Sequence, residues 1–330
     1  MNTYGNETHV IFGSGPIGLA LMNELVSQGK RVRIVNRSGF LQRPVPSGVE
    51  LARGDAADPE AARALCQGAA VVYNCANPPY TKWPEKFPPL QAGVLAGAES
   101  VGARLVAMEN VYMYGPTGGR PMTEDLPYAA TSRKGRVRAR LAKELLAAHA
   151  AGKVRVAIGR ASDFFGPAAL QSTAGERMFV PALAGKTVQV LGNPDLLHTY
   201  TYVPDIAKGL AILGQRDEAL GQVWHLPSAQ TITTRQFIEQ ICQMNGQKSH
   251  IQAVPRLLIQ ALGFFNPLMD ELVEMQYEFE APFILDNTRF VKAFGDISTP
   301  LPEAIRCTAH WFLERTELKA GFFHAEAQRR

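Results

Sequence analysis

Three glycines near the beginning of the chain are spaced as they are in sites for phosphate groups. Gly13, Gly15 and Gly18 form the pattern G-x-G-x-x-G, which follows a short apolar run and opens a segment rich in Ala and Leu. In a turn between a strand and a helix, the first glycine permits the tight turn. The second lets the backbone approach a pyrophosphate, and the third lets the helix pack on the strand. The helix N-terminus, with Pro16 and Ile17, would direct N–H groups at the phosphates, so the pattern predicts a dinucleotide site.

The sequence around the glycines supports this prediction. Ile17, Leu21 and Leu25 recur at the spacing of one face of a helix, and a second β-rich run begins shortly after Gly29. A strand, a glycine turn, a helix and a second strand form the unit in which this pattern binds dinucleotides. The alternative is a glycine-rich turn that holds no ligand.

The end of the second strand predicts which dinucleotide is bound. An acidic residue there would bond the adenosine ribose hydroxyls and repel a 2′-phosphate. This chain instead has Asn36, followed by Arg37 and Ser38. A guanidinium and a hydroxyl without a carboxylate suit a phosphate dianion, because Arg binds phosphate through two parallel hydrogen bonds. We therefore expect NADP to be preferred over NAD; if Arg37 only extends into solvent, the preference stays open.

The elements that must position this turn alternate along the first half of the chain. Short β-rich runs at 9–12, 31–35, 49–52, 70–74, 104–108 and 154–159 are separated by helical segments at 16–28, 59–66, 90–101 and 132–150. The expected fold class is α/β, a Rossmann-type doubly wound parallel sheet with a smaller C-terminal substrate lobe. We expect the NAD(P)-binding domain over residues 1–166 and the substrate lobe mainly over 167–330. Segments near 200–228 and 281–290 are expected to return to the first domain.

Further motifs lie along nearly the whole chain. They are GDAAD at 54–58, NCAN at 74–77, VYMYGP at 111–116, GRASDFFGP at 159–167, TYVPDIAKGL at 201–210 and DNTRFVKAFG at 286–295. With the glycine pattern, they resemble the extended branch of the short-chain dehydrogenase/reductase superfamily, that is, the NAD-dependent epimerase/dehydratase family. The resemblance implies that Asp55 and Ala56 flank the adenine, and that Cys75 and Ala76 lie along the ribose and diphosphate.

In that family the chemistry comes from a Ser, a Tyr and a Lys, the last two in a Y-x-x-x-K arrangement, and this chain departs from it. Counted back from the family's Gly, the Ser position holds Asn110. Depending on loop length, the Tyr position holds Ser132 or Lys134, and the Lys position holds Arg136 or Arg138. The chain therefore resembles an atypical subgroup that lacks the Tyr-x-x-x-Lys motif.

Several residues could replace the missing groups. Asn110 could donate a hydrogen bond to a substrate oxygen, Arg136 could hold the nicotinamide ribose or an anionic substrate, and Lys134 belongs to the same cationic segment. The tyrosines that could supply an acid from elsewhere are Tyr112, Tyr114 and Tyr128. For each Tyr the alternative is ordinary packing, and for the cations it is the solvated face of a helix.

The substrate position also departs from the family. Nucleotide-sugar enzymes of the branch place an Arg seven residues before the position of Asp205, where this chain has His198. Neutral imidazole holds a diphosphate poorly at pH 7, which disfavours a nucleotide sugar. His198 and Tyr80 are candidate substrate contacts, although a lone His is often a packed residue.

Composition places the chain among ordinary folded proteins. Of its 330 residues, 46% are hydrophobic and 19% are charged, and the formal net charge is +4. We expect a small-molecule substrate, no nucleic-acid or membrane partner, and a homodimer by family analogy. The four cysteines are far apart and without metal-ligand spacing, and the N-terminus lacks a signal-peptide pattern. These features predict a cytoplasmic protein without a metal.

Two functions follow from these observations. The first is an NAD(P)-dependent oxidoreductase or epimerase-like enzyme that acts on a small carbonyl, alcohol or sugar-like molecule through a nonstandard acid. The second is a catalytically degenerate NADP-binding protein that senses redox state or regulates a partner. The intact glycine pattern favours the first, and the missing Tyr and Lys favour the second.

Overall fold

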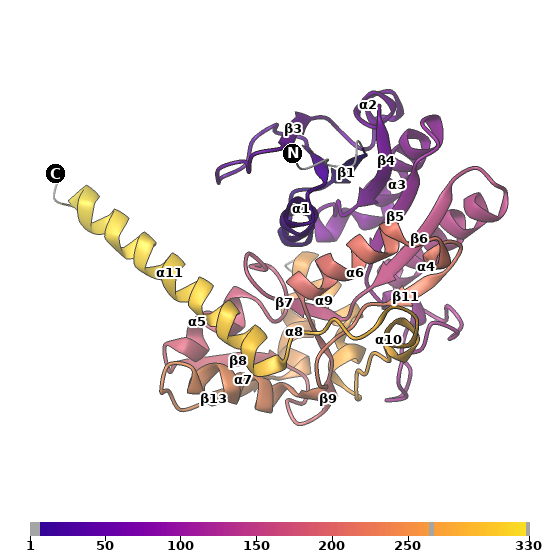
Figure 1. The fold of residues 1–330 in the computed structure, drawn as a ribbon. Helices are drawn as coiled ribbons and strands as arrows, with labels where there is room; N and C mark the ends of the chain where they lie inside the picture. Colours follow the sequence, from indigo (N-terminus) through magenta and orange to yellow (C-terminus); the bar gives the residue numbers. More distant parts are fainter. Residues whose placement is uncertain (1–6, 264–266, 328–330) are drawn as a thin grey trace.

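Seven parallel strands form the central sheet of the computed structural model, which describes residues 7–263 and 267–327 (Figure 1). In spatial order they are β11 (Val223–His225), β6 (Arg155–Arg160), β5 (Arg104–Glu109), β4 (Ala69–Asn74), β1 (Thr8–Phe12), β2 (Arg31–Asn36) and β3 (Val49–Arg53). The chain winds outward in both directions from the boundary between β1 and β4, which is where ligands bind in doubly wound sheets. The predicted Rossmann-type fold class is confirmed.

Helices cover both faces of this sheet. They are α1 (Pro16–Ser27), α2 (Pro59–Leu65), α3 (Trp83–Ser100), α4 (Arg133–Ala150) and α6 (Val203–Gln215). Ile11 lies in one buried cluster with side chains of α1 and α6, whereas Val10 and Phe12 lie in another with side chains of α2, α3 and α4. Because successive residues of a strand point to opposite faces, the two clusters are the two sides of the sheet.

The remaining elements lie mostly in a second layered region below the sheet in Figure 1. The strands are β7 (Asp163–Phe165), β8 (Thr187–Leu191), β9 (Leu197–His198), β10 (Tyr200–Tyr202), β12 (Ile232–Thr233) and β13 (His250–Val254). The helices are α5 (Glu176–Leu183), α7 (Thr234–Gln243), α8 (Arg256–Gly263), α9 (Pro267–Glu274), α10 (Thr288–Phe294) and α11 (Leu301–Ala327). The 3-10 turns of the chain are η1 (Tyr80–Lys82), η2 (Tyr112–Tyr114), η3 (Asp217–Ala219) and η4 (Gln276–Phe279).

Aromatic rings form the core of this second region. The Phe165 and Phe237 ring centroids lie 5.0 Å apart, and those of Phe179 and Phe312 lie 5.3 Å apart. Phe312 belongs to α11, which extends away from the body of the molecule (Figure 1). These contacts tie the base of α11 to α5 and α7.

Two late segments lie beside the first sheet. Strand β11 pairs with β6 and so extends the parallel sheet at one edge. The ring of Trp224 on β11 lies 4.8 Å from that of Phe294 on α10. Residues from both halves of the chain therefore build the edge of the sheet.

One helix begins earlier than the sequence predicts. The expected start at residue 90 is wrong, because α3 already begins at Trp83 and contains Pro88 and Pro89. A proline inside a helix removes a backbone hydrogen bond, which is why the pattern predicts a later start. Trp83 and Phe87 are both buried, and this burial holds the first turn in place.

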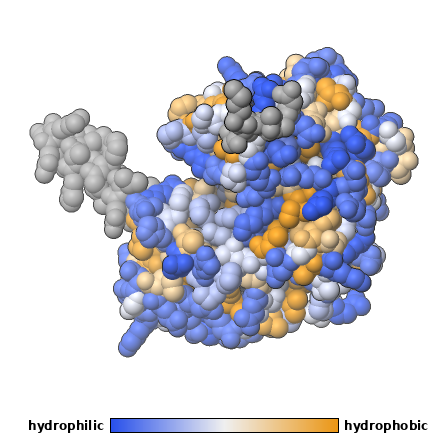
Figure 2. All heavy atoms as spheres, viewed as in Figure 1, coloured by the Kyte–Doolittle hydropathy of each residue, from blue (hydrophilic) through white to orange (hydrophobic). Residues whose placement is uncertain are grey.

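The helices of the described residues offer no segment that is both long and apolar enough to cross a membrane. The face shown in Figure 2 is mostly hydrophilic, with its hydrophobic side chains in small groups.

Candidate active site

The glycine turn connects β1 with α1, and its glycines have different surroundings. Gly13 adopts a φ of +105°, and a Cβ there would lie 2.7 Å from the backbone of Ala76. A Cβ at Gly18 would lie 2.0 Å from the carbonyl oxygen of Gly13. At Gly15 no atom of the described chain lies within 4 Å of the position that a Cβ would take. Gly13 and Gly18 therefore shape the turn, whereas Gly15 faces open space.

The first turn of α1 offers its N–H groups to an anion. Gly15 is the N-cap and brings no capping side chain, and Pro16 and Ile17 follow without an acidic residue in the first turn. The uncapped N–H groups and the positive end of the helix dipole attract negative charge. This arrangement fits the pyrophosphate of a dinucleotide.

Asn36 ends β2 and organises the loop that follows. Its Nδ2 donates hydrogen bonds to Ser14 Oγ at 3.0 Å and to the carbonyl of Phe40 at 2.9 Å. Its Oδ1 accepts a hydrogen bond from Ser38 Oγ at 3.1 Å. The loop is therefore held beside Ser14 of the glycine turn, and Arg37 is exposed on it.

The residues expected along the adenine and ribose follow β3 and β4. The Asp55 carboxylate accepts a hydrogen bond from the backbone two residues later at 3.0 Å, and Ala56 is buried. Ala76 lies against Gly13, so the turn after β4 borders the glycine turn. Burial raises the pKa of the Cys75 thiol to about 12, which keeps it protonated and unreactive. Together with the glycine turn, these residues fit an NAD(P) molecule.

Helix α4 brings two cations into the interior. Ser132 is its N-cap, where Oγ accepts a hydrogen bond from a backbone N–H at 3.1 Å. Lys134 and Arg138 are only 1% and 7% exposed, whereas Arg136 lies on the exposed side and donates to the carbonyl of Thr131. Of the two registers that the sequence leaves open, Lys134 with Arg138 is the one that faces inward, one helical turn apart.

Lys134 sits between a carboxylate and an aromatic ring. Its Nζ donates to the Glu271 carboxylate of α9 and lies 4.0 Å from the centroid of the Tyr80 ring. Burial lowers the pKa of Lys134 to about 8, against the opposing effect of the carboxylates Glu274 and Asp270. A lysine with this pKa exchanges a proton near neutral pH, as a general acid or base must.

Arg138 lies one turn further along α4, against α3. Its guanidinium is 4.1 Å from the centroid of the Phe87 ring and 4.6 Å from that of Trp83. Burial lowers its pKa to about 10, so it stays charged at neutral pH. Its Nε is buried and has no hydrogen-bond partner in the described part of the chain. The positive charge is therefore held by stacking and leaves one donor for another group.

Asn110 and Tyr112 lie in the turn after β5. Asn110 Oδ1 accepts a hydrogen bond from the N–H of Tyr112 at 3.3 Å, which leaves the amide of Asn110 to donate elsewhere. Burial, and next the carboxylate of Glu278, raise the pKa of Tyr112 well above its ordinary value. The same two causes raise the pKa of Tyr80. Both hydroxyls therefore stay protonated, and because they share a hydrogen bond, one of the two protons is left to donate to another group.

The other two tyrosines that the sequence offers as acids belong to a buried ionic network. Arg160 donates to Glu109 at 3.1 Å, to Tyr114 Oη at 2.7 Å and to Tyr128 Oη at 2.6 Å. Tyr114 Oη also lies 2.7 Å from Nε2 of His225 on the edge strand β11. This network is not predicted from the sequence, although Arg160, directly after the expected β-rich run at 154–159, is a signal for it.

His198 lies in an aromatic pocket and has an acidic partner. Its Nε2 is 3.1 Å from Asp163 Oδ2, and its ring centroid is 4.7 Å from that of Tyr200 and 5.0 Å from that of Phe283. At 3% exposure it is packed on all sides. Asp163 belongs to the motif at 159–167, but the sequence analysis assigns it no role.

A segment that carries no recognisable motif completes the site. Arg133, at the first turn of α4, forms an ion pair with Asp270 at 2.8 Å, and its N–H donates to the Glu274 carboxylate. Glu278 of η4 is 2% exposed. The acidic residues of this segment match no spacing that indicates chemistry, so the sequence alone does not point to it.

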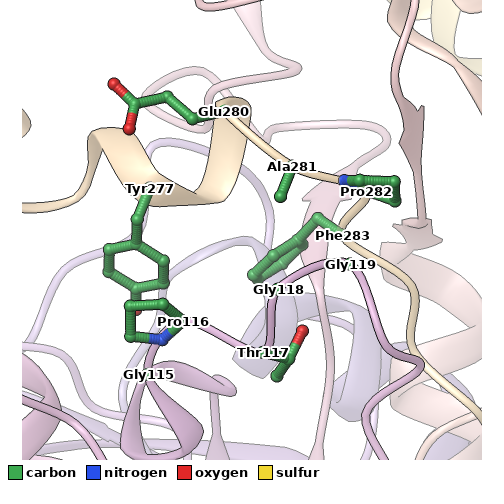
Figure 3. A pocket seen from close by; sticks show the side chains of 10 residues that line it. All are labelled: Gly115, Pro116, Thr117, Gly118, Gly119, Tyr277, Glu280, Ala281, Pro282 and Phe283. Carbon is green, nitrogen blue, oxygen red and sulfur yellow. The ribbon is translucent and has the colours of Figure 1, made fainter.

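A pocket of about 170 Å³ lies beside η4. One wall is formed by residues 115–119, and the other by Tyr277 and residues 280–283. Figure 3 shows the Tyr277 ring against Pro116, whereas the carboxylate of Glu280 points away from the pocket. The volume is below the roughly 300–1,000 Å³ of drug-sized ligand sites. This pocket therefore does not hold a dinucleotide, but it brings solvent close to Tyr277.

Comparison with known proteins agrees with this architecture. A model of the NAD dependent epimerase/dehydratase family matches residues 10–226. The chain belongs to this family. The match includes the glycine turn, both cations of α4 and His198, and so confirms the resemblance found in the sequence. A search of curated protein sequences finds no match to the chain.

Solved structures with the same fold cover nearly the whole chain. An epimerase from Methanothermobacter thermautotrophicus has a TM-score of 0.79 at 18% identity, covering 96% of this chain and 94% of its own. The dTDP-glucose 4,6-dehydratase of Bacillus anthracis, in complex with NAD, has a TM-score of 0.76 at 14% identity, with 94% and 98% covered. The UDP-glucose 4-epimerase of Thermotoga maritima, with UDP-glucose, has a TM-score of 0.74 at 14% identity, with 94% and 99% covered. At these identities the likeness concerns the fold.

Proposed function

We propose that this protein is an NADP-preferring oxidoreductase or epimerase-like enzyme in which Lys134 moves the proton. The observation that carries the proposal is the buried pair of cations, Lys134 and Arg138, one helical turn apart on α4. Their spacing equals that of the Tyr and Lys in the family motif Y-x-x-x-K. A lysine with a pKa of about 8 is a suitable acid or base at neutral pH.

The residues around Lys134 divide the remaining work. A bound nicotinamide supplies hydride transfer to or from the substrate carbon. Lys134 Nζ donates a proton to the substrate oxygen in reduction and accepts it in oxidation. Arg138, with its unpartnered Nε, stabilises negative charge on that oxygen or holds the nicotinamide ribose. The amide of Asn110 and the one hydroxyl proton that the Tyr80–Tyr112 pair leaves free donate hydrogen bonds that orient the substrate.

The preference for NADP rests on the loop after β2. Asn36 replaces the acid that would repel a 2′-phosphate, and its hydrogen bond with Ser38 keeps that hydroxyl in the loop. Arg37 is exposed beside them and has the planar guanidinium that binds phosphate. No carboxylate stands at the end of β2 to favour the free ribose hydroxyls of NAD.

Calorimetric titration with NADPH, NADP, NADH and NAD tests the cofactor part. We expect NADP(H) to bind tightest, Gly15→Asp to bind none of the four, and Arg37→Ala to lose preference for the phosphorylated forms. Arg216→Ala, an exposed arginine on the far end of α6, is the matched control and should bind as the wild type does. Absence of binding by all four nucleotides would refute the proposal.

A panel of aldehydes and ketones with NADPH tests the enzymatic part. We expect consumption of NADPH that Lys134→Met reduces by a factor of about 10² to 10⁴, the contribution typical of a general acid. A protein that binds NADP(H) but turns over no carbonyl compound would instead support the redox-sensing alternative. In that case oxidised and reduced cofactor should differ in affinity or in their effect on oligomeric state.

A further inference from the structure

Unpartnered polar atoms gather in one short segment of the site. Glu274 Oε2, Gln276 Oε1, Tyr277 Oη and Glu278 Oε1 are buried side-chain atoms without a hydrogen-bond partner in the described part of the chain. Gln276 and Glu278 are 5% and 2% exposed. Glu274 Oε2 still has an ion pair with Arg133 at 3.6 Å, so it is better compensated than the other three atoms. Folded proteins leave few buried polar groups unpaired, because each destabilises the fold.

This segment borders the residues proposed to react. The carboxylate of Glu278 acts on the hydroxyls of Tyr80 and Tyr112, and on Asp163, and burial with the charge of Asp163 raises the pKa of Glu278 well above its ordinary value. Glu271, in the preceding helix, holds Lys134. Glu278 and Tyr277 therefore lie close to Tyr80, the ring that packs on Lys134, and Tyr277 also forms a wall of the outer pocket (Figure 3).

The chemistry of these atoms defines a ligand. Three of them are carboxylate or amide oxygens, which accept hydrogen bonds, and the fourth is a hydroxyl, which can also accept. The hydroxyl of Tyr277 and the protonated carboxyl of Glu278 can also donate, so a neutral ligand with hydroxyl or amino groups can satisfy the set. A phosphate has acceptor oxygens and negative charge, so it does not satisfy unpartnered acceptor atoms, and the carboxylate of Asp163 beside Glu278 would repel it.

We propose that Gln276, Tyr277 and Glu278 recognise the substrate, and that the substrate is an unphosphorylated molecule presenting hydroxyl or amino donors. The proposal rests on the proposed function, since it assigns the substrate class of the same site. It assigns η4 a role in specificity that no motif of the sequence indicates. These three side chains bring no positive charge, so we expect them to favour such a substrate over one with a diphosphate.

The stability of the unliganded protein provides the first test. Glu278→Met replaces a buried, unpartnered carboxyl group by an apolar side chain of similar length. We expect the thermal midpoint to rise by about 2 °C or more, because a desolvated polar group is removed. Glu280→Met is the matched control: its carboxylate is exposed and pairs with Arg256, so its replacement should bring no such rise. A lower midpoint for Glu278→Met would show a structural carboxylate and overturn the proposal.

Binding with saturating NADP provides the second test. Two sets of compounds are compared, and within each set the carbon skeleton is constant while the charge differs. The first set is glucose, glucosamine and glucose 6-phosphate, and the second is glycerol, serinol and glycerol 3-phosphate. We expect the unphosphorylated hydroxyl and amino compounds to bind the wild type and raise its thermal midpoint. Their affinity should be at least tenfold weaker for Glu278→Met and for Tyr277→Phe. Binding led by the phosphate esters, unchanged affinity in Glu278→Met, or no binder in either set would each overturn the proposal. The stability test needs neither cofactor nor turnover, so it stands if the proposed function fails.

Discussion

The pKa of Lys134 is a property that can be measured without knowing the substrate. An ordinary lysine has a pKa of 10.5, and burial lowers that of Lys134 to about 8. At roughly 1.4 kcal/mol for each pKa unit, the ammonium is about 3.5 kcal/mol less favourable in the folded protein than in the unfolded chain. The unfolded chain therefore binds this proton more tightly between pH 8 and 10.5. Across that window the free energy of unfolding should rise with pH by about 3.5 kcal/mol relative to Lys134→Met.

Two measurements check this value. Nuclear magnetic resonance of ¹³Cε-labelled lysines should show one resonance with a midpoint near pH 8, which is absent from Lys134→Arg. Urea unfolding gives the free energy of unfolding of the wild type and of Lys134→Met at pH 7.5, 9 and 10.5. The value for the wild type should increase relative to that for Lys134→Met as pH rises. A midpoint at pH 10 or above, or parallel pH profiles of the two proteins, would refute the assignment of Lys134 as the proton-transfer group.

Four further predictions follow from the same structure. Reduction of a carbonyl substrate should lose activity as pH rises through about 8, and oxidation should gain it, with neither limb present in Lys134→Arg; steady-state rates across pH 6–10 check this. Gly18→Ala should cost about 3 kcal/mol or more, since its Cβ would lie 2.0 Å from a backbone oxygen, whereas Gly15→Ala should unfold at the wild-type urea concentration. Arg160→Met should cost about 3–5 kcal/mol because it leaves Glu109 buried and unpaired, and Arg160→Met with Glu109→Gln should recover part of that loss in urea unfolding. Glu271→Gln removes the negative charge beside Lys134, so the titration midpoint of Lys134 should fall below 8 in the same resonance experiment.

The strands could be predicted from the sequence because their signals are local. Each apolar run of the first half is bounded by polar or glycine residues, and the observed strands begin and end within about one residue of the expected positions. The start of α3 could not be predicted, since the burial that holds Trp83 and Phe87 comes from α4, far along the chain. Local patterns therefore identify elements and fail where tertiary packing overrides propensity.

The candidate site divides in the same way. The glycine turn and Asn36 are recognisable because their roles depend on spacing along a single βαβ unit. The partner of Lys134 is not recognisable, because Glu271 is 137 residues away and lies in a segment without a motif. The two possible registers of the cations on α4 likewise required the structure, because loop length before Ser132 cannot be read from spacing alone.

The ion pairs between α4 and α9 also have a consequence for the order of assembly. Contacts between residues so far apart in sequence form late, since closing a long loop costs entropy before any contact is gained. The glycine turn and strands β1 to β6 lie in the first half of the chain, whereas the burial of Lys134 needs residues near 270. During synthesis the growing chain would acquire its dinucleotide pocket first and its proton-transfer group last. A chain truncated before the residues near 270 would therefore be expected to bind the cofactor without catalysing a reaction.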